Sequence, residues 1–287
     1  MDKRRVFRSK ADAYSGGPQW PQGIFTLLLE KSGFDPDDSQ GLKNLIAVDV
    51  GAGTGNTAFP LADLGCTVIA VEPNRPMLEK LIALKEAGGY DNVIPTDGDA
   101  MDLKIPVEYR GRADLIYAAN AAHWWSSKIQ GIAKGSERRA AGAWSVAGRP
   151  NAKVAIVYLR PQERDPFVKE LHEIISRHFS AIRHIPTEAT VKKVLSVEAF
   201  GDYFMRNNGK PAVSETYGDY DFSFRDFKVF KSWLLNLSYM PDNAFENEAA
   251  TAEFRAFYDA AARRGNGAAS VVQGLRLYTG LLSRDSY

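Results

Sequence analysis

A glycine-rich loop directly after a buried strand is the feature that most constrains this chain. Residues 45–50 are almost entirely apolar, which is typical of a strand covered on both faces of a sheet. Glycines follow at 51, 53 and 55, and glycine is needed where a turn has positive φ or a bulky ligand approaches the backbone. Residues 57–64 then predict a short helix, whose first amide groups favour an anionic or electron-rich ligand. The pattern predicts a ligand-binding turn between a strand and a helix.

Strand-like and helix-like segments alternate through the rest of the first half. Strands are predicted at 67–71, 92–95, 113–118 and 153–159, and helices at 75–87 and about 126–146. This rhythm predicts a parallel sheet with helices on both faces. The second half is rich in aromatic residues and contains three amphipathic helical patterns before residues 268–282 alternate like a closing strand. We therefore expect the chain to leave the sheet after Leu159, build a substrate-covering cap, and return.

An acid stands at the end of the second predicted strand. This residue, Glu72, is placed so that its carboxylate can accept two hydrogen bonds from a ribose diol, as the acid does in dinucleotide-binding folds. Two cofactors fit this much: a nicotinamide dinucleotide and S-adenosylmethionine. The dinucleotide fingerprint is Gly-x-Gly-x-x-Gly, whereas this loop reads Gly-x-Gly-x-Gly and is preceded by Asp49. The loop spacing therefore favours S-adenosylmethionine.

Several segments carry a resemblance to one family. Val48 to Asn56 resembles motif I of the class I methyltransferases, which use S-adenosylmethionine. Residues 67–74 resemble their second-strand motif, and Gly98-Asp99-Ala100-Met101 resembles the segment that binds adenine. Residues 114–124 resemble motif IV of the small-molecule branch that includes trans-aconitate methyltransferase-like proteins (methyltransferase type 11/25). The segments 11–14, 18–21 and 237–239 are also similar to that branch.

The sequence departs from that family in two places. Residues 141–152 lack the usual Arg-Val-Leu followed by a Pro-Gly-Gly turn, and Trp20 stands where a tyrosine is common. These departures bear on the subfamily rather than on the cofactor. An Asn-Pro-Pro-Tyr type of tetrapeptide does not follow the fourth strand, which argues against methylation of amino groups on nucleic-acid bases.

The resemblance implies an overall architecture. We expect a Rossmann-like, doubly wound α/β fold with a mostly parallel seven-stranded sheet and a helical, aromatic cap inserted after the fifth strand. Residues 1–40 would form a helical segment that closes over the cofactor, and residues 41–160 the S-adenosylmethionine-binding core. Residues 161–241 would form the substrate cap, and residues 242–287 the C-terminal helix and closing strand of the core.

The resemblance also implies roles for single residues. Asp49 is expected to order the loop and approach the methionine amine, Glu72 to take the ribose hydroxyls, and Asp99 to flank adenine. Asn120 and Tyr14 are expected to contact the methionine portion and the cofactor's carboxylate. The complete set of expected cofactor-binding residues is Tyr14, Asp49, Gly51, Ala52, Gly53, Glu72, Pro73, Asp99, Ala100 and Asn120.

His123 is the candidate catalytic residue. It lies just past the fourth predicted strand, where the transferred methyl group should point. A neutral imidazole there can accept the proton of a hydroxyl group, which favours methyl transfer to oxygen. The alternative, that His123 only shapes the pocket, stays open. Substrate contacts are expected from Trp20, Trp124 and Tyr239, and one of the adjacent Trp124 and Trp125 is expected to line the pocket while the other packs.

Composition bounds the partners. The chain has 36 Lys and Arg against 35 Asp and Glu, which leaves no electrostatic footprint for nucleic acid or an anionic membrane. We therefore expect a small-molecule substrate, no nucleic-acid or membrane partner, and a monomer or homodimer. The single cysteine, Cys66, excludes an internal disulfide and a multi-thiolate zinc site, and we expect no metal and a buried structural thiol.

A cytoplasmic location is expected. No apolar signal-peptide core follows the basic first residues, and the apolar runs are too short to span a bilayer.

Two alternatives to a methyltransferase remain. One is an S-adenosylmethionine-binding protein or non-methylating enzyme of the same fold, and the other is an NAD(P)-dependent oxidoreductase.

Overall fold

The structure is a computed structural model of the 287-residue chain. It describes residues 11–125, 135–162, 164–180, 182, 206–207, 210–211, 213–237 and 240–282.

The strands form a seven-stranded sheet in the order β3-β2-β1-β4-β5-β9-β8. Parallel pairings join β1 to β2, β1 to β4, β2 to β3 and β4 to β5. The sheet is mostly parallel and has helices packed on it, which confirms the predicted Rossmann-like fold class. The strand bounds are β1 Ile46–Val50, β2 Thr67–Val71, β3 Val93–Thr96, β4 Ala113–Ala119, β5 Gly148–Pro161, β8 Val213–Phe224 and β9 Ala269–Leu281.

Hydrogen bonds at two points show that β9 runs antiparallel to β5. The N–H of Leu282 donates to the carbonyl of Ala152 at 2.8 Å, and the N–H of Gln162 donates to the carbonyl of Val272 at 3.0 Å. The pairing thus advances along β5 while it moves backwards along β9. β5, β9 and β8 have 14, 13 and 12 residues, so each of them is longer than any of the strands β1 to β4.

The chain divides into two compact units, and each of the three long strands contributes to both. One unit comprises Gln22–Tyr158, Lys192–Tyr217 and Arg276–Tyr287, and we call it the sheet unit. The other comprises Met1–Pro21, Leu159–Val191 and Gly218–Leu275, and we call it the helical unit.

The helices of the sheet unit pack on short parallel strands. α4 (Ala58–Asp63) contacts β2 and β3, and α2 (Gln22–Lys31) contacts α4. α5 (Arg75–Gly88) begins at a side-chain cap from Asn74 and ends where Gly89 takes a φ of 67°, a left-handed conformation that glycine adopts without strain. The remaining helices are α3 (Ser39–Asn44) and α6 (Ser136–Ala147). These elements bury β1 completely, so the residues that follow it are held by a rigid strand.

The helical unit has an aromatic core. Its described α-helices are α1 (Ala11–Ser15), α7 (Pro166–His178), α10 (Phe227–Asn236) and α11 (Glu248–Arg264). The ring of Phe167 lies 4.7 Å from that of Phe257 and 5.9 Å from that of Phe224, as measured between centroids. The hydroxyl of Tyr258 donates to the carbonyl of Phe224 at 3.1 Å, which satisfies the polar end of a mostly buried ring. The aromatic residues of this half therefore build a core of their own.

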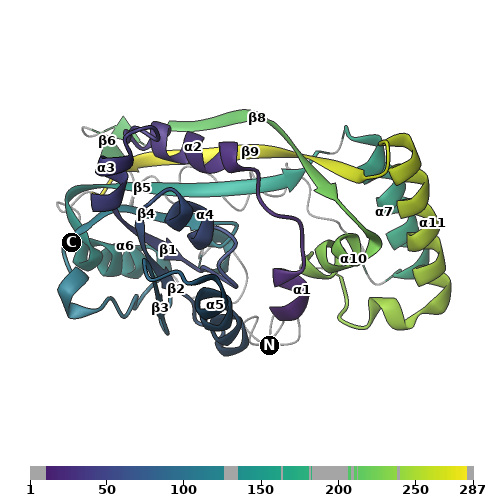
Figure 1. The fold of residues 1–287 in the computed structure, drawn as a ribbon, viewed down its shortest axis with the longest axis horizontal. Helices are drawn as coiled ribbons and strands as arrows, with labels where there is room; N and C mark the ends of the chain where they lie inside the picture. The colour runs from purple at the N-terminus through teal and green to yellow at the C-terminus, as the bar shows by residue number, and fades with distance from the viewer. Residues whose placement is uncertain are drawn as a thin grey trace. The chain divides into compact units, whose positions relative to one another are not determined.

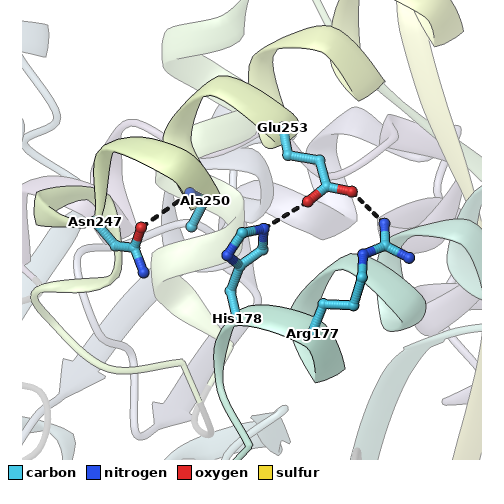
Figure 2. A network of polar contacts seen from close by, with 5 residues as sticks. All are labelled: Arg177, His178, Asn247, Ala250 and Glu253. Atoms are coloured by element: carbon cyan, nitrogen blue, oxygen red, sulfur yellow. Dashed lines mark hydrogen bonds and ion pairs between the residues drawn. The ribbon is translucent and has the colours of Figure 1, made fainter.

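An ion-pair cluster joins two helices of this unit. α7 and α11 lie side by side (Figure 1). His178 Nε2 lies 2.5 Å from Oε2 of Glu253, while the neighbouring Arg177 contacts the other carboxylate oxygen (Figure 2). Both side chains come from the last turn of α7, where the positive charge of Arg177 also interacts favourably with the helix dipole. Hydrogen bonds to His178 and Arg177 hold the pKa of Glu253 below its usual value.

Two segments differ from the sequence prediction. β8 was missed because residues 213–224 mix small, polar and aromatic residues, although Tyr220, Phe222 and Phe224 alternate with exposed residues at strand spacing.

β5 begins five residues earlier than predicted. Its pairing with β4 jumps from Gly148 opposite Ala113 to Lys153 opposite Leu115, so residues 149–151 bulge outward. Sequence periodicity does not reveal such a bulge, because the apolar alternation resumes only after it.

Candidate functional site

The glycine loop is fastened to the end of β2. The N–H groups of Gly51 and Ala52 both donate to the carbonyl of Val71, at 2.9 and 3.0 Å. The next amide, that of Gly53, donates to Oε2 of Glu72 at 2.8 Å. Three successive backbone donors are therefore used inside the protein, and the loop is shaped before any ligand arrives.

Glycine is required at position 51 for two reasons. Its φ is 82°, a region that other residues enter only with strain. A Cβ at Gly51 would also lie 2.7 Å from the Cβ of Ala121, closer than real carbon atoms approach. Gly53 and Gly55 have φ values of 60° and 95°. The loop thus touches the turn after β4, so two strand ends meet at one edge of the sheet.

Asp49 is a buried carboxyl just before the loop. It lies on β1 with no exposed surface, and its Oδ2 accepts a hydrogen bond of 2.6 Å from the hydroxyl of Thr57. Among the described residues its Oδ1 has no hydrogen-bond partner, although it is also buried. Burial raises the pKa of Asp49 to about 7, and the hydrogen bond from Thr57 partly opposes that rise. The protein therefore keeps an acceptor that is costly to bury and incompletely paired.

Glu72 is a second buried carboxyl beside the same loop. Its Oε2 accepts from the N–H of Gly53 and its Oε1 from the N–H of Asn74, both at 2.8 Å. Burial raises the pKa of Glu72 to about 7, the two amide donors lower it, and the charge of Asp49 raises it. A carboxylate oxygen accepts more than one hydrogen bond, so each oxygen of Glu72 retains capacity for a ligand hydroxyl.

Asp99 closes a tight turn after β3. Its Oδ1 accepts from the N–H of Met101 at 2.8 Å and of Asp102 at 3.1 Å. Gly98 precedes it, and a Cβ there would lie 2.7 Å from backbone atoms of Asp102 and Leu103, so only glycine fits. Ala100 is buried. The segment predicted to flank adenine is thus a rigid turn, which the hydrogen bonds to the Asp99 side chain hold in place.

The turn after β4 completes this edge of the sheet. Asn120 has a φ of 50°, which is uncommon outside glycine, and its N–H donates to the carbonyl of Val157 on β5 at 2.8 Å. The short helix η3 (Ala122–Trp124) follows and contains His123. Open α/β sheets bind ligands at the carboxyl ends of their strands. The structure therefore places Asn120 and the backbone of His123 at that edge.

The other predicted site residues are placed less completely. The side chain of His123 lies outside the described part of the chain, and so does Tyr239. Tyr14 in α1 and Trp20 after it are half-buried and belong to the helical unit. Pro73 and Trp124 are half-buried in the sheet unit. The roles given to these residues stay predictions.

Two contributors to the site were missed from the sequence. Thr57 binds Asp49 through its hydroxyl, and Tyr117 on β4 donates from its hydroxyl to the Thr57 carbonyl at 3.3 Å. A threonine at the start of a helix was a visible signal, because such residues normally cap it. Here the side chain makes no cap hydrogen bond. Tyr117 stands in an apolar strand and carried no comparable signal.

The structure also bears on other expectations. Cys66 is a free thiol with no exposed surface, which confirms the predicted burial, and burial raises its pKa to about 11. Within the described residues, no group of three His, Cys, Asp or Glu side chains could hold a metal ion. No helix in the described ranges is both long and apolar enough to cross a membrane.

Comparisons with known proteins agree with this architecture. The methyltransferase domain family matches residues 47–138, the stretch from β1 to the first residues of α6. The chain is 29% identical over 183 residues to an uncharacterised methyltransferase of Mycobacterium tuberculosis and to one of Mycobacterium bovis. Each match covers 63% of this chain and 63% of the relative, so the chain spans less than two thirds of these proteins.

Solved structures show the same fold. A proposed type II methyltransferase from Anaeromyxobacter dehalogenans superimposes with a TM-score of 0.58 at 20% identity, covering 92% of this chain and 97% of the other. The likeness extends beyond the family match and includes the second half of the chain. The family match rests on the segment that holds the glycine loop, Glu72, Asp99 and Asn120. Residues 47–138 of this chain are therefore similar in sequence to a methyltransferase domain, and they lie in a fold that solved methyltransferase structures share.

Proposed function

We propose that this chain binds S-adenosylmethionine at the glycine loop and transfers its methyl group to a small molecule. The observation that carries the proposal is the pair of buried acids at the loop, Asp49 and Glu72. Burial raises the pKa of each to about 7, and no positive group in the described part of the chain lowers it. S-adenosylmethionine carries positive charge on its sulfonium and on its ammonium group. A ligand cation near these carboxylates would compensate the cost of burying them.

The donors of the loop favour this cofactor over a dinucleotide. A pyrophosphate group needs free backbone N–H groups at the glycine turn. The amides of Gly51, Ala52 and Gly53 already donate to the carbonyl of Val71 and to Glu72. The loop therefore offers carboxylate oxygens rather than amide donors, which suits a cation with ribose hydroxyls.

These residues fit the cofactor part by part. The buried carboxylate of Asp49 would attract the ammonium group through its charge, and the spare capacity of Glu72 would accept the ribose hydroxyls. Asp99 has one carboxylate oxygen engaged in its own turn, which leaves the other for the amino group of adenine. Because Gly51 has no Cβ, the loop can lie against Ala121, in the turn that also contains Asn120.

Methyl transfer requires that the two reactants are aligned and that a group accepts one proton. When bound, S-adenosylmethionine supplies an electrophilic methyl group. The residues at the strand ends hold the reactants in line, and such positioning supplies much of a displacement rate. His123 would accept the proton of a substrate hydroxyl, which makes oxygen the favoured acceptor. The near-balance of charge favours a small-molecule substrate over nucleic acid or a membrane, and we propose a monomer or homodimer that binds neither of the latter.

A ligand-induced change in melting temperature tests the proposal. Saturating S-adenosylhomocysteine should raise the Tm, because a ligand at 100 times its Kd stabilises the native state by about 2.7 kcal/mol. NAD⁺ at the same concentration is the matched control and should leave the Tm unchanged. A rise with NAD⁺ and none with S-adenosylhomocysteine would reverse the assignment. Binding of S-adenosylhomocysteine without methylation of any acceptor would point to a binding protein instead.

A further inference from the structure

Thr57 directly precedes α4 but does not cap it. A polar side chain at this position normally accepts a hydrogen bond from an amide of the first helical turn, as Asn74 does from Met77 at the start of α5. Thr57 makes no such bond. Its buried hydroxyl instead donates to Oδ2 of Asp49 at 2.6 Å. The residue therefore gives up a local stabilisation of its own helix and serves the acid of β1.

Tyr117 fixes the backbone of Thr57. Asp49 and Tyr117 lie opposite each other in the parallel pairing of β1 with β4. The hydroxyl of Tyr117, a residue with no exposed surface, donates to the carbonyl of Thr57 at 3.3 Å. Two hydrogen bonds in series thus join β4 to the start of α4 and the start of α4 to β1. The Thr57 hydroxyl is held at Asp49 by contacts with the sheet.

The surroundings of Asp49 make this donor important for its charge. Asp49 has no exposed surface, and its neighbours across the sheet are Tyr117 on β4 and Ala70 on β2. Glu72, which follows β2, is an acid whose pKa the charge of Asp49 raises, so the two carboxylates disfavour each other. Burial raises the pKa of Asp49 to about 7, and the hydrogen bond from Thr57 opposes that rise because a donor favours the ionised form.

We propose that Thr57 is a positioning residue for cofactor binding, whose hydroxyl favours the ionised form of Asp49 and so lets that carboxylate attract the ammonium group of S-adenosylmethionine. The inference rests on the proposed function, because it takes Asp49 as the acid that attracts this group. Without the hydroxyl, Asp49 would keep its proton to a higher pH. The cofactor would then lose an attractive charge at neutral pH, although no residue that touches it had changed.

The pH dependence of ligand affinity tests the role of the hydroxyl. Thr57→Val removes it at nearly constant side-chain volume, and Thr57→Ser keeps it. Both are titrated by calorimetry from pH 6 to pH 8.5 with S-adenosylhomocysteine, which carries the same ammonium group. Thr57→Val should bind roughly fivefold more weakly than wild type at pH 7, because less of its Asp49 is ionised, and should approach wild type at pH 8.5. Thr57→Ser should stay within about twofold of wild type throughout.

A purely structural role would give a different profile. A loss in Thr57→Val that is equal at every pH, or no loss at all, would overturn the proposal. Thr57→Ala removes the same hydroxyl and repeats the test if the valine variant does not fold. Thr67→Val is the matched control, because it makes the same change at the far end of β2 from Glu72, and it should leave the affinity within about twofold of wild type.

Carboxyl NMR separates this inference from the proposed function. The ¹³C resonance of the Asp49 carboxyl, assigned by its absence in Asp49→Asn, is followed with pH in ligand-free protein. Its titration midpoint should lie at higher pH in Thr57→Val than in wild type. If S-adenosylhomocysteine does not bind wild-type protein, the proposed function fails and takes the cofactor role of Thr57 with it. Binding to wild type together with equal midpoints in the two proteins overturns this inference alone.

Discussion

The carboxylate of Glu72 accepts the N–H of Gly53 at 2.8 Å, so the acid that ends β2 holds the loop that follows β1. The same carboxylate also accepts the N–H of Asn74 at 2.8 Å and thereby fixes the start of α5. One buried side chain thus sets the positions of three segments around the proposed cofactor site. Its two jobs, shaping the loop and meeting a ribose, use different lone pairs of the same oxygens.

Glu72→Gln should weaken S-adenosylhomocysteine binding. The amide keeps one acceptor oxygen but presents an NH₂ group to either Gly53 or Asn74, and a hydrogen bond to a charged acceptor contributes about 1.5–3 kcal/mol. We expect a loss of at least tenfold in affinity, measured by isothermal titration calorimetry. Glu79→Gln is the control, because Glu79 is exposed and pairs with Arg75 on the same helix, α5. Unchanged affinity in Glu72→Gln would refute the ribose assignment.

Gly51→Ala should destabilise the protein more than Gly89→Ala. Both glycines have positive φ, 82° and 67°, so both variants carry the strain of a left-handed alanine, about 1 kcal/mol. Only Gly51 also faces an atom, the Cβ of Ala121 at 2.7 Å, whereas nothing lies within 4 Å of a Cβ at Gly89. Overpacking adds about 1–3 kcal/mol. Urea unfolding measures the free energy of unfolding of both variants. Equal losses would show that the loop shifts to accommodate the added Cβ at no cost.

Asp49→Asn should make stability less dependent on pH. Burial raises the pKa of Asp49 from 3.8 to about 7, so the folded state holds its proton more tightly than the unfolded state. The stability contributed by the protonated form is complete below pH 4 and is lost as the pH rises towards 7. The stability of wild-type protein relative to Asp49→Asn should therefore fall between pH 4 and 7 and level off above it, as followed by urea unfolding at each pH.

The same substitution should have the opposite effect on ligand binding. A deprotonated Asp49 attracts the cation of S-adenosylmethionine, so affinity in wild-type protein should increase as the pH rises through 7. Asp49→Asn should bind more weakly at pH 8 and lose most of this pH dependence. Calorimetric titrations at pH 6 and 8 measure this pH dependence of the affinity. A variant that binds as tightly as wild type at pH 8 would contradict the proposed interaction between Asp49 and the cofactor.

Glu253→Gln should destabilise the helical unit near neutral pH. Hydrogen bonds to His178 and Arg177 lower the pKa of Glu253, so the stabilisation is present above the ordinary carboxyl pKa and is lost as the pH falls below about 4. The variant and wild type should therefore converge in stability at acid pH. Glu170→Gln on α7 is the matched control, because its 3.4 Å pair with Arg264 also spans α7 and α11 and is well exposed. Chemical unfolding at pH 7 and pH 3.5 distinguishes them.

His123→Ala should abolish most methyl transfer while S-adenosylhomocysteine affinity is kept. General-base catalysis contributes about 10²–10⁴-fold to a rate, so kcat should fall by that range if His123 takes the proton. A fall that a higher pH partly restores supports the base, since hydroxide or a pre-ionised substrate replaces it. Turnover that is unchanged in His123→Ala would leave only a role in shaping the pocket.

The parallel half of the fold was predictable because its signals are local. β2 was predicted with its observed bounds, Thr67–Val71, since a buried strand between a helix and an acid is visible in a few residues. β8 was not, because its second half depends on aromatic residues that pack on a helix distant in the sequence, such as Phe224 against Phe167 of α7. Glu72 and Asp49 could be named from spacing, whereas the hydrogen bonds from Thr57 to Asp49 and from Tyr117 to Thr57 depend on tertiary contacts.

The position of β9 in the sheet has a consequence for biosynthesis. β5 ends at Pro161, yet its antiparallel neighbour begins at Ala269, so the pairing closes a loop of about a hundred residues. While the ribosome is still adding those residues, the nascent chain exposes β5 as an unprotected edge. Sheet completion is a late, non-local event, and such events make folding slow. We therefore expect nascent chains stalled before residue 269 to be prone to aggregation and to depend on chaperones.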